Sequence, residues 1–148
     1  MINIMSCDKS EVDGIGPSDY LVFGHYYGKC FGEGCVETFK LEDRRLLEAT
    51  FDQYAPQSFY NFEAFDVLSD AKFEAVKDLI SFFPEELLSD ERTIIGQPDA
   101  GDWGGIYVEI KTESIHRFWL LDQMDTDMPE KYNAFVDRIN EKITLINQ

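Results

Sequence analysis

The chain has 148 residues and a formal net charge of −16, from 29 Asp and Glu against 13 Lys and Arg. A chain of this length suits one domain whose core is large enough to fold without a metal or a disulfide framework. The acidic surface excludes nucleic acid as a partner, because binding to phosphate backbones depends on Lys and Arg. A basic protein or a cation would be attracted instead, although the same charge also serves simply to keep a monomer soluble.

The beginning of the chain differs from the rest in composition. Small and polar residues predict a flexible tether over residues 1–18, followed by a single α+β domain over residues 19–148. The sequence contains no apolar run of about 18 residues, the length that a transmembrane helix requires.

A short motif in this tether, Met5-Ser6-Cys7-Asp8-Lys9, resembles the processing site of lipoproteins from Bacteroidetes-type bacteria. The resemblance implies that Cys7 is lipidated and that the mature protein is anchored in the bacterial envelope, in the outer membrane or periplasm. Only six residues precede Cys7, fewer than an apolar export segment needs. Either such a segment is encoded upstream of Met1, or the match is coincidental and the protein is cytoplasmic.

Two β-strands are predicted after the tether, and a cysteine pair lies between them. Residues 20–27 are rich in β-formers, and residues 35–41 alternate apolar and polar side chains. Glycines around Cys30 and Cys35 let the backbone turn sharply enough for the two cysteines to reach disulfide distance. We expect a disulfide in an oxidising envelope and two free thiols in a reducing cytosol.

The middle of the chain predicts a third strand, a loop and a helix. Residues 44–51 are the expected hairpin partner, and residues 52–67 read as a loop dense in aromatic side chains. Ser69 is a helix cap that precedes an amphipathic stripe, and Pro84 ends that helix and starts a short second one.

The last third of the chain predicts a second hairpin followed by a helix. Residues 106–111 and 115–121 are the expected strands, and Pro129 opens the final amphipathic helix. The order β-β-β-α-β-β-α predicts an α+β fold with an antiparallel sheet of four to five strands and two helices on one face. Five side chains from both halves should then be buried together: Val76, Leu79, Val108, Phe135 and Ile139.

This layout is similar to small uncharacterised domains of Bacteroidetes lipoproteins, in which a glycine–cysteine turn joins two early strands and a Pro-Asp loop precedes the last hairpin. Some of those domains carry cysteines beside the Pro-Asp pair. Here Gln97 and Ala100 flank Pro98-Asp99, so a second disulfide of that type is not expected. The resemblance implies fold and location, and no activity.

Catalytic and metal chemistry find little support in the sequence. The two histidines, His25 and His116, lie within predicted strands, and no motif pairs either with a nucleophile. The acidic run from Asp122 to Glu130 departs from a calcium-loop pattern, and acids are also favoured before a helix N-terminus. We therefore predict no catalytic residue, no metal site and no cofactor.

Binding is the function that the sequence favours. Asp99 and Asp102 share a glycine-rich loop with Trp103, and Tyr60 lies in the aromatic loop, where the same residues could instead fill the core. The leading hypothesis is a monomeric, non-enzymatic accessory or binding domain of the envelope for an unknown protein or glycan, which meets a membrane only through a lipid anchor. The alternative is an acidic inhibitor or immunity-type protein that masks a basic site on a partner protein.

Overall fold

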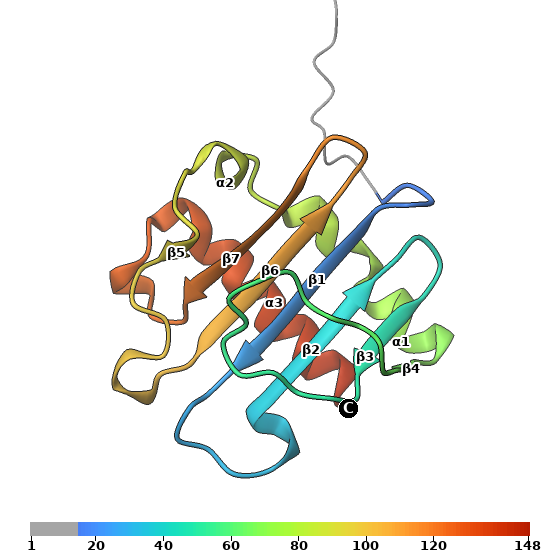
Figure 1. Cartoon of the computed structure of the whole chain (residues 1–148), viewed down its shortest axis with the longest axis horizontal. Helices are drawn as coiled ribbons and strands as arrows, with labels where there is room; N and C mark the ends of the chain where they lie inside the picture. The colour runs from blue at the N-terminus through green and yellow to red at the C-terminus, as the bar shows by residue number, and fades with distance from the viewer. Residues whose placement is uncertain (1–14) are drawn as a thin grey trace, which may run out of the picture.

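The computed structural model describes residues 15–148, which form one mixed sheet of seven strands in the order β4-β3-β2-β1-β6-β7-β5 (Figure 1). The strands are β1 (Tyr20–Tyr26), β2 (Val36–Leu41), β3 (Leu46–Ala49), β4 (Phe65–Val67), β5 (Ile94–Ile95), β6 (Gly105–Lys111) and β7 (His116–Asp122). The helices are α1 (Asp70–Val76), α2 (Glu86–Ser89) and α3 (Glu130–Ile146), with 3-10 turns η1 (Glu33–Cys35), η2 (Lys77–Phe82), η3 (Ala100–Asp102) and η4 (Asp125–Asp127).

The central pair of the sheet joins the two halves of the chain. β1 and β6 pair antiparallel along their whole length, and each carries its own hairpin partner, β2 or β7, on its outer side. Side chains of a strand alternate between the two faces, so Leu21 and Phe23 enter the main core while Val22 lies on the opposite face. The two predicted hairpins are therefore the backbone of one continuous sheet.

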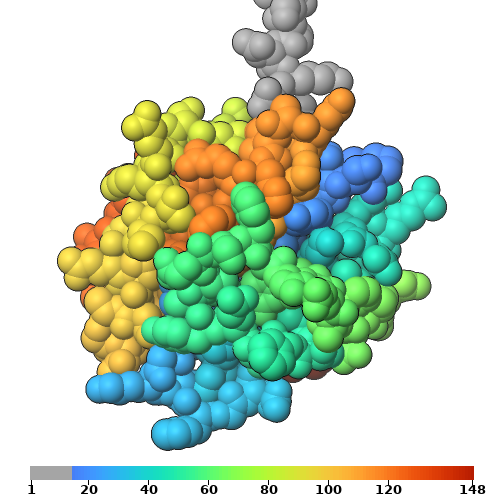
Figure 2. Space-filling view, viewed as in Figure 1, coloured from blue at the N-terminus to red at the C-terminus, as the bar shows by residue number. Residues whose placement is uncertain are grey.

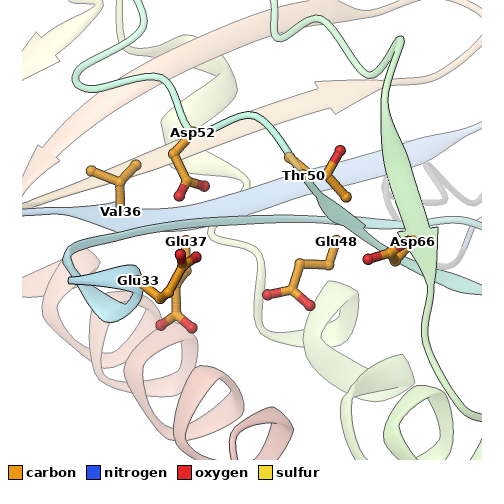
Figure 3. Close-up of a pocket in the computed structure, with 8 residues that line it drawn as sticks. Glu33, Val36, Glu37, Glu48, Thr50, Asp52 and Asp66 are labelled. Carbon is orange, nitrogen blue, oxygen red and sulfur yellow. The ribbon is translucent and has the colours of Figure 1, made fainter.

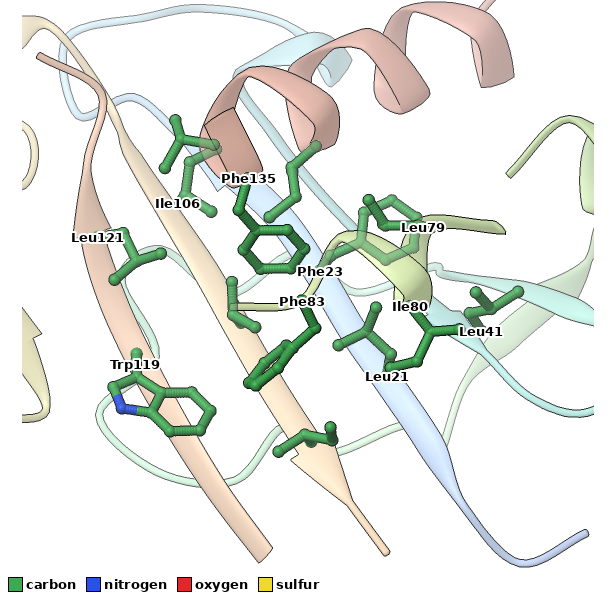
Figure 4. Packing of buried hydrophobic residues seen from close by; sticks show 14 of the residues in the cluster. Leu21, Phe23, Leu41, Leu79, Ile80, Phe83, Ile106, Trp119, Leu121 and Phe135 are labelled. Atoms are coloured by element: carbon green, nitrogen blue, oxygen red, sulfur yellow. The ribbon is translucent and has the colours of Figure 1, made fainter. Parts of the chain in front are cut away.

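The described helices lie on one face of this sheet (Figure 1). Ser69 caps α1 as predicted, because its side chain accepts a hydrogen bond from the N–H of Lys72, and η2 continues α1 toward Pro84. Figure 4 shows Phe83 between the side chains of Trp119 and Leu21 from the sheet, with Phe135 next to it. All five residues expected to share the core do so, each at most 1% exposed: Val76, Leu79, Val108, Phe135 and Ile139.

The opposite face is crossed by an irregular segment, residues 50–64, which we call the strap (Figure 1). It covers a second, smaller cluster formed mainly by Val22, Tyr26, Tyr60, Tyr107 and Leu120. The sheet is thus buried on both faces, by helices on one and by the strap on the other.

The expectation of four to five antiparallel strands was wrong in number and partly wrong in direction, whereas the α+β class is confirmed. Two short strands were missed: β4 lies inside the predicted loop 52–67, and β5 follows α2. β5 pairs parallel to β7, so the sheet is mixed. Strands of three and two residues are too short to show a period-two pattern. The short helix predicted to start at Pro84 is α2, which accompanies the two longer helices.

The N-terminal part of the chain is only partly described. Cys7 and its proposed lipidation lie outside residues 15–148. The last residues of the expected tether are described: Ile15 packs against the main core, and the N–H of Gly16 donates to Asp19. Within the described part, no helix combines the length and the apolar character needed to cross a bilayer.

Candidate functional site

Three loops meet at one end of the sheet around the carboxylate of Asp99. Its Oδ2 accepts hydrogen bonds from the N–H of Gly28 at 2.9 Å and from the hydroxyl of Tyr54 at 2.6 Å. Its Oδ1 accepts the N–H of Gly104 at 3.0 Å. Because hydrogen bonds to an ionised acceptor are stronger than neutral ones, Asp99 fixes the β1–η1 loop, the strap and its own loop relative to one another.

The backbone of this loop explains why an aspartate stands there. Asp99 has a φ of 60°, in the left-handed region that Asp, Asn and Gly tolerate best. This conformation turns the chain back so that the N–H of Asp99 donates to the carbonyl of Gly104 at 2.9 Å. The Pro-Asp pair recognised in the sequence therefore shapes the loop and also anchors its neighbours.

Aromatic side chains stand exposed on the three loops that Asp99 holds. Trp103 is 62% exposed and Tyr54 is 52% exposed, although both belong to residue types that folding usually buries. Asp102 lies beside them and faces Lys29 at 3.7 Å, an exposed pair of little energetic weight. Figure 2 shows the gold, green and blue segments that carry these residues at the lower part of one face. We call Asp99, Asp102, Trp103 and Tyr54 the three-loop site.

The hydrogen bonds of the three-loop site hold its loops in position. Both oxygens of Asp99 accept hydrogen bonds from the surrounding loops, so the carboxylate acts as an anchor for them. The hydrogen bond to Asp99 raises the pKa of Tyr54, and burial adds to this effect. Tyr54 therefore keeps its proton and remains a donor to Asp99 at neutral pH.

Tyr60, the fourth residue proposed from the sequence, lies elsewhere. Its side chain is buried, at 9% exposure, and packs against Phe62 and Tyr107 beneath the strap. Its hydroxyl donates to the carbonyl of Phe51, and its N–H donates to Glu109. The structure thus brings together Asp99, Asp102 and Trp103, adds Tyr54, and assigns Tyr60 to the packing of the strap.

The strap is held by a polar cluster centred on Glu109, which is fully buried. Its Oε2 accepts the hydroxyl of Tyr107 at 2.7 Å and the N–H of Tyr60 at 2.8 Å, and its Oε1 lies 3.0 Å from the hydroxyl of Tyr20 and 2.9 Å from Nε2 of His116. Burial, followed by the charge of Glu109, raises the pKa values of Tyr20 and Tyr107. The sequence did not indicate this cluster, because the alternating pattern of the strand predicts that Glu109 faces solvent.

Both histidines take structural roles. His116 stacks on Phe59 of the strap, with ring centroids 3.5 Å apart, besides its contact with Glu109. His25 bridges the carbonyl of Gly34 and the carboxylate of Glu37. Cys30 and Cys35 form a disulfide with a Cα–Cα distance of 5.6 Å, so neither is a free nucleophile for these histidines.

A second charged feature is a hollow of about 270 Å³ where β2 and β3 diverge (Figure 3). The register between these strands ends at Phe39↔Glu48. We call this the acidic hollow, and its lining includes five carboxylates: Glu33, Glu37, Glu48, Asp52 and Asp66.

The carboxylates of the acidic hollow influence one another. Burial and then the neighbouring carboxylate charges raise the pKa values of Glu48 and Asp52, whereas the hydrogen bond from His25 lowers that of Glu37. The arrangement attracts positive charge, although within residues 15–148 no group of His, Cys, Asp and Glu side chains is placed to hold a metal ion.

The acidic run before α3 is also used by the fold. The carboxylate of Asp122 accepts the N–H of Gln97 at 2.7 Å and that of Met124 at 2.9 Å, and the side chain is buried. Asp122 therefore ties the loop after β5 to the end of β7.

Comparison with known proteins adds no assignment. No model of a known protein family matches the chain, and no curated protein sequence matches it either.

Proposed function

We propose that this chain is a non-enzymatic, envelope-associated binding domain whose contact surface is the three-loop site. The observation that carries the proposal is the set of three hydrogen bonds to Asp99, which fix the loops that expose Trp103 and Tyr54. A contact surface that is already ordered loses less conformational entropy when it binds. Exposed Trp and Tyr side chains are the residue types that most often anchor a partner.

The ligand that suits this surface is a protein or a glycan with an apolar patch bordered by polar groups. Trp103 and Tyr54 supply flat apolar area with one hydrogen-bonding group each, and Asp102 supplies an exposed carboxylate beside them. The formal charge of −16 adds a bias toward partners of positive charge.

The test compares two exposed aromatic residues on different faces of the protein. Wild type, Trp103→Ala and Phe82→Ala are immobilised and exposed to a glycan array and to a solubilised envelope fraction. Phe82 is 38% exposed at the end of η2 and serves as the matched control. We expect ligands that are retained by wild type and Phe82→Ala but lost by Trp103→Ala.

Circular dichroism of each variant accompanies this comparison. If Trp103→Ala is folded and retains every ligand, the three-loop site is not the contact surface. If Trp103→Ala fails to fold, Trp103 has a structural role and the proposal is wrong in its main residue.

Two features support the envelope location. The Cys30–Cys35 disulfide suits an oxidising compartment, and the segment around Cys7 resembles a lipoprotein processing site. The codons upstream of Met1 provide the test. An encoded apolar run that follows Lys or Arg supports the location, and a stop codon directly upstream contradicts it.

A second candidate function, an acidic inhibitor or immunity-type protein, is favoured by the acidic hollow. Its carboxylates come from β2, β3, β4, η1 and the strap, and they line one hollow that a basic region of a partner could enter. Electrostatic steering weakens as salt screens the charges. Binding that falls steeply with ionic strength and is lost in Asp52→Asn, but not in Trp103→Ala, would favour this function over the first.

A further inference from the structure

Within residues 15–148, strand β4 is an edge of the sheet whose outward main-chain groups have no strand partner. Its three residues, Phe65, Asp66 and Val67, are all exposed. The N–H of Leu68 donates to the carbonyl of Leu46 on β3. Because bonded positions alternate in an antiparallel ladder, Asp66 also bonds toward β3, and Phe65 and Val67 direct their N–H and C=O groups to the free edge.

The side chains of β4 also lack favourable neighbours: like charges face each other on one side of the strand, and apolar side chains are exposed on the other. Asp66 lies directly opposite Glu48 in the β3–β4 register, which places two carboxylates side by side on the same face of the sheet. Like charges in such a cross-strand pair are destabilising. Burial raises the pKa of Glu48, and the charge of Asp66 is among the further causes. On the other face, Phe65 is 38% exposed and Val67 is 57% exposed.

We propose that β4 is a docking edge for an extended segment of a basic partner protein, in which Lys or Arg alternates with apolar residues. The segment adds an eighth strand to the seven of the sheet and pairs with the main-chain groups of Phe65 and Val67. This inference concerns a different surface from the three-loop site and does not depend on it.

The register of the added strand follows from the geometry of β4. A residue of the partner opposite Asp66 occupies a pair without mutual hydrogen bonds, where side chains approach most closely. A Lys or Arg at that point neutralises the adjacent carboxylates of Asp66 and Glu48. Its two neighbours point to the other face and cover Phe65 and Val67, so they are apolar.

A second copy of the chain fits this edge poorly. A two-fold antiparallel pairing centred on β4 would bring the Asp66 side chains of both copies together. The formal charge of −16 on each copy adds to the repulsion. Charge complementarity therefore favours a basic partner as the occupant.

The experiment uses the whole chain and a short blocked peptide of alternating Val and Lys. One control peptide has the same composition with the lysines grouped at one end, and another alternates Val and Glu. Affinity is measured by isothermal titration calorimetry, and amide hydrogen exchange is followed by NMR. We expect the Val-Lys peptide alone to bind and to protect the N–H groups of Phe65 and Val67.

Two variants probe the main chain of the edge. Val67→Pro removes an outward N–H, a change that an edge strand tolerates, and should weaken binding by about tenfold, the loss of one main-chain hydrogen bond of about 1.4 kcal/mol. Val67→Thr keeps the N–H and should bind like wild type.

Two further variants probe the charge. Asp66→Lys should transfer the preference to the Val-Glu peptide. Asp137→Lys changes the net charge equally on the exposed face of α3 and should leave the preference intact.

Several results would overturn the inference. These are equal binding of the grouped-lysine peptide, an absence of protection at Phe65 and Val67 in wild type, or full affinity in a folded Val67→Pro. The protection measured in wild type decides the matter if Val67→Pro does not fold. A dimer that forms through β4, detected by analytical ultracentrifugation, would assign the edge to a second copy. Trp103→Ala should not change peptide binding. A negative result for the β4 edge can therefore be distinguished from a negative result for the three-loop site.

Discussion

The two faces of the sheet are buried in different ways. On the helix side, apolar side chains from α1, η2, α2 and α3 pack against alternate positions of β1, β2, β6 and β7. On the strap side, aromatic residues surround a fully buried carboxylate, Glu109, which accepts hydrogen bonds from the sheet and from the strap. The helix side buries mainly apolar area, whereas the irregular strap is positioned by directional bonds to a buried charge.

This difference affects the proposed contact surface. The strap contributes Tyr54 to the three-loop site, so the position of the strap determines whether Asp99 receives one of its donors. A buried carboxylate is costly unless its hydrogen bonds are complete. Glu109 therefore couples the packing of the strap to the order of the loops that expose Trp103.

The largest expected effect lies on the helix side. Phe135→Ala removes a buried ring that contacts Phe83 and should lower the free energy of unfolding by about 3–5 kcal/mol. Urea denaturation followed by circular dichroism measures this loss. A loss below about 1 kcal/mol would mean that the two layers are not packed as described.

The next effect lies on the strap side. Glu109→Gln keeps the shape of the side chain but removes the charge and places donor hydrogens against Tyr107 or Tyr20, and it should cost about 2–3 kcal/mol. Glu63→Gln, an exposed position of the strap, is the control and should change stability by less than about 0.5 kcal/mol. Equal effects of the two variants would contradict the role assigned to Glu109.

Alkaline pH should destabilise both faces. Burial and Glu109 raise the pKa of Tyr107, and burial with the Asp90 hydrogen bond raises the pKa of Tyr132, on the helix side, to about 12. A raised pKa means that the folded chain retains a proton which the unfolded chain loses above pH of about 10.

The contribution of these tyrosines to the free energy of unfolding should therefore be fully present below that pH. It should decrease as the pH rises further, by up to about 1.4 kcal/mol per pH unit for each such tyrosine. Tyr107→Phe should reduce this slope, whatever its effect at neutral pH. Urea denaturation at a series of pH values measures the slope, and an unchanged slope in Tyr107→Phe would refute the assignment.

The smallest effect separates the two carboxylates of the three-loop site. Asp99→Asn weakens three hydrogen bonds and should cost about 1–2 kcal/mol, whereas Asp102→Asn breaks an exposed ion pair and should cost less than about 0.5 kcal/mol. Thermal unfolding of both variants measures the difference. Equal melting temperatures would show that Asp99 does not organise the loops.

The sequence was informative where a pattern repeats and uninformative where a residue acts through a distant partner. The alternation in β2 and β6, the Ser69 cap and the apolar stripe of α3 each reflect local geometry, and all were predicted. The glycine-rich cysteine turn likewise indicated the disulfide.

The unpredicted features share a physical reason. The hydrogen bonds that Tyr60 donates to Glu109 and Tyr54 donates to Asp99 span 49 and 45 residues, so no local periodicity indicates them. Tyr60 is buried although the sequence predicts a binding residue there, because aromatic composition alone does not distinguish an exposed ring from a buried one.

The coupling of the strap to the three-loop site through Glu109 is tested most sharply by native-state amide hydrogen exchange of Glu109→Gln compared with wild type. We expect protection to fall in the strap, residues 50–64, and in the loop around Asp99, while α3 keeps the protection of the wild type apart from a uniform shift set by global stability. Loss spread evenly over the sheet, the helices and the strap, or no loss in the strap, would contradict it.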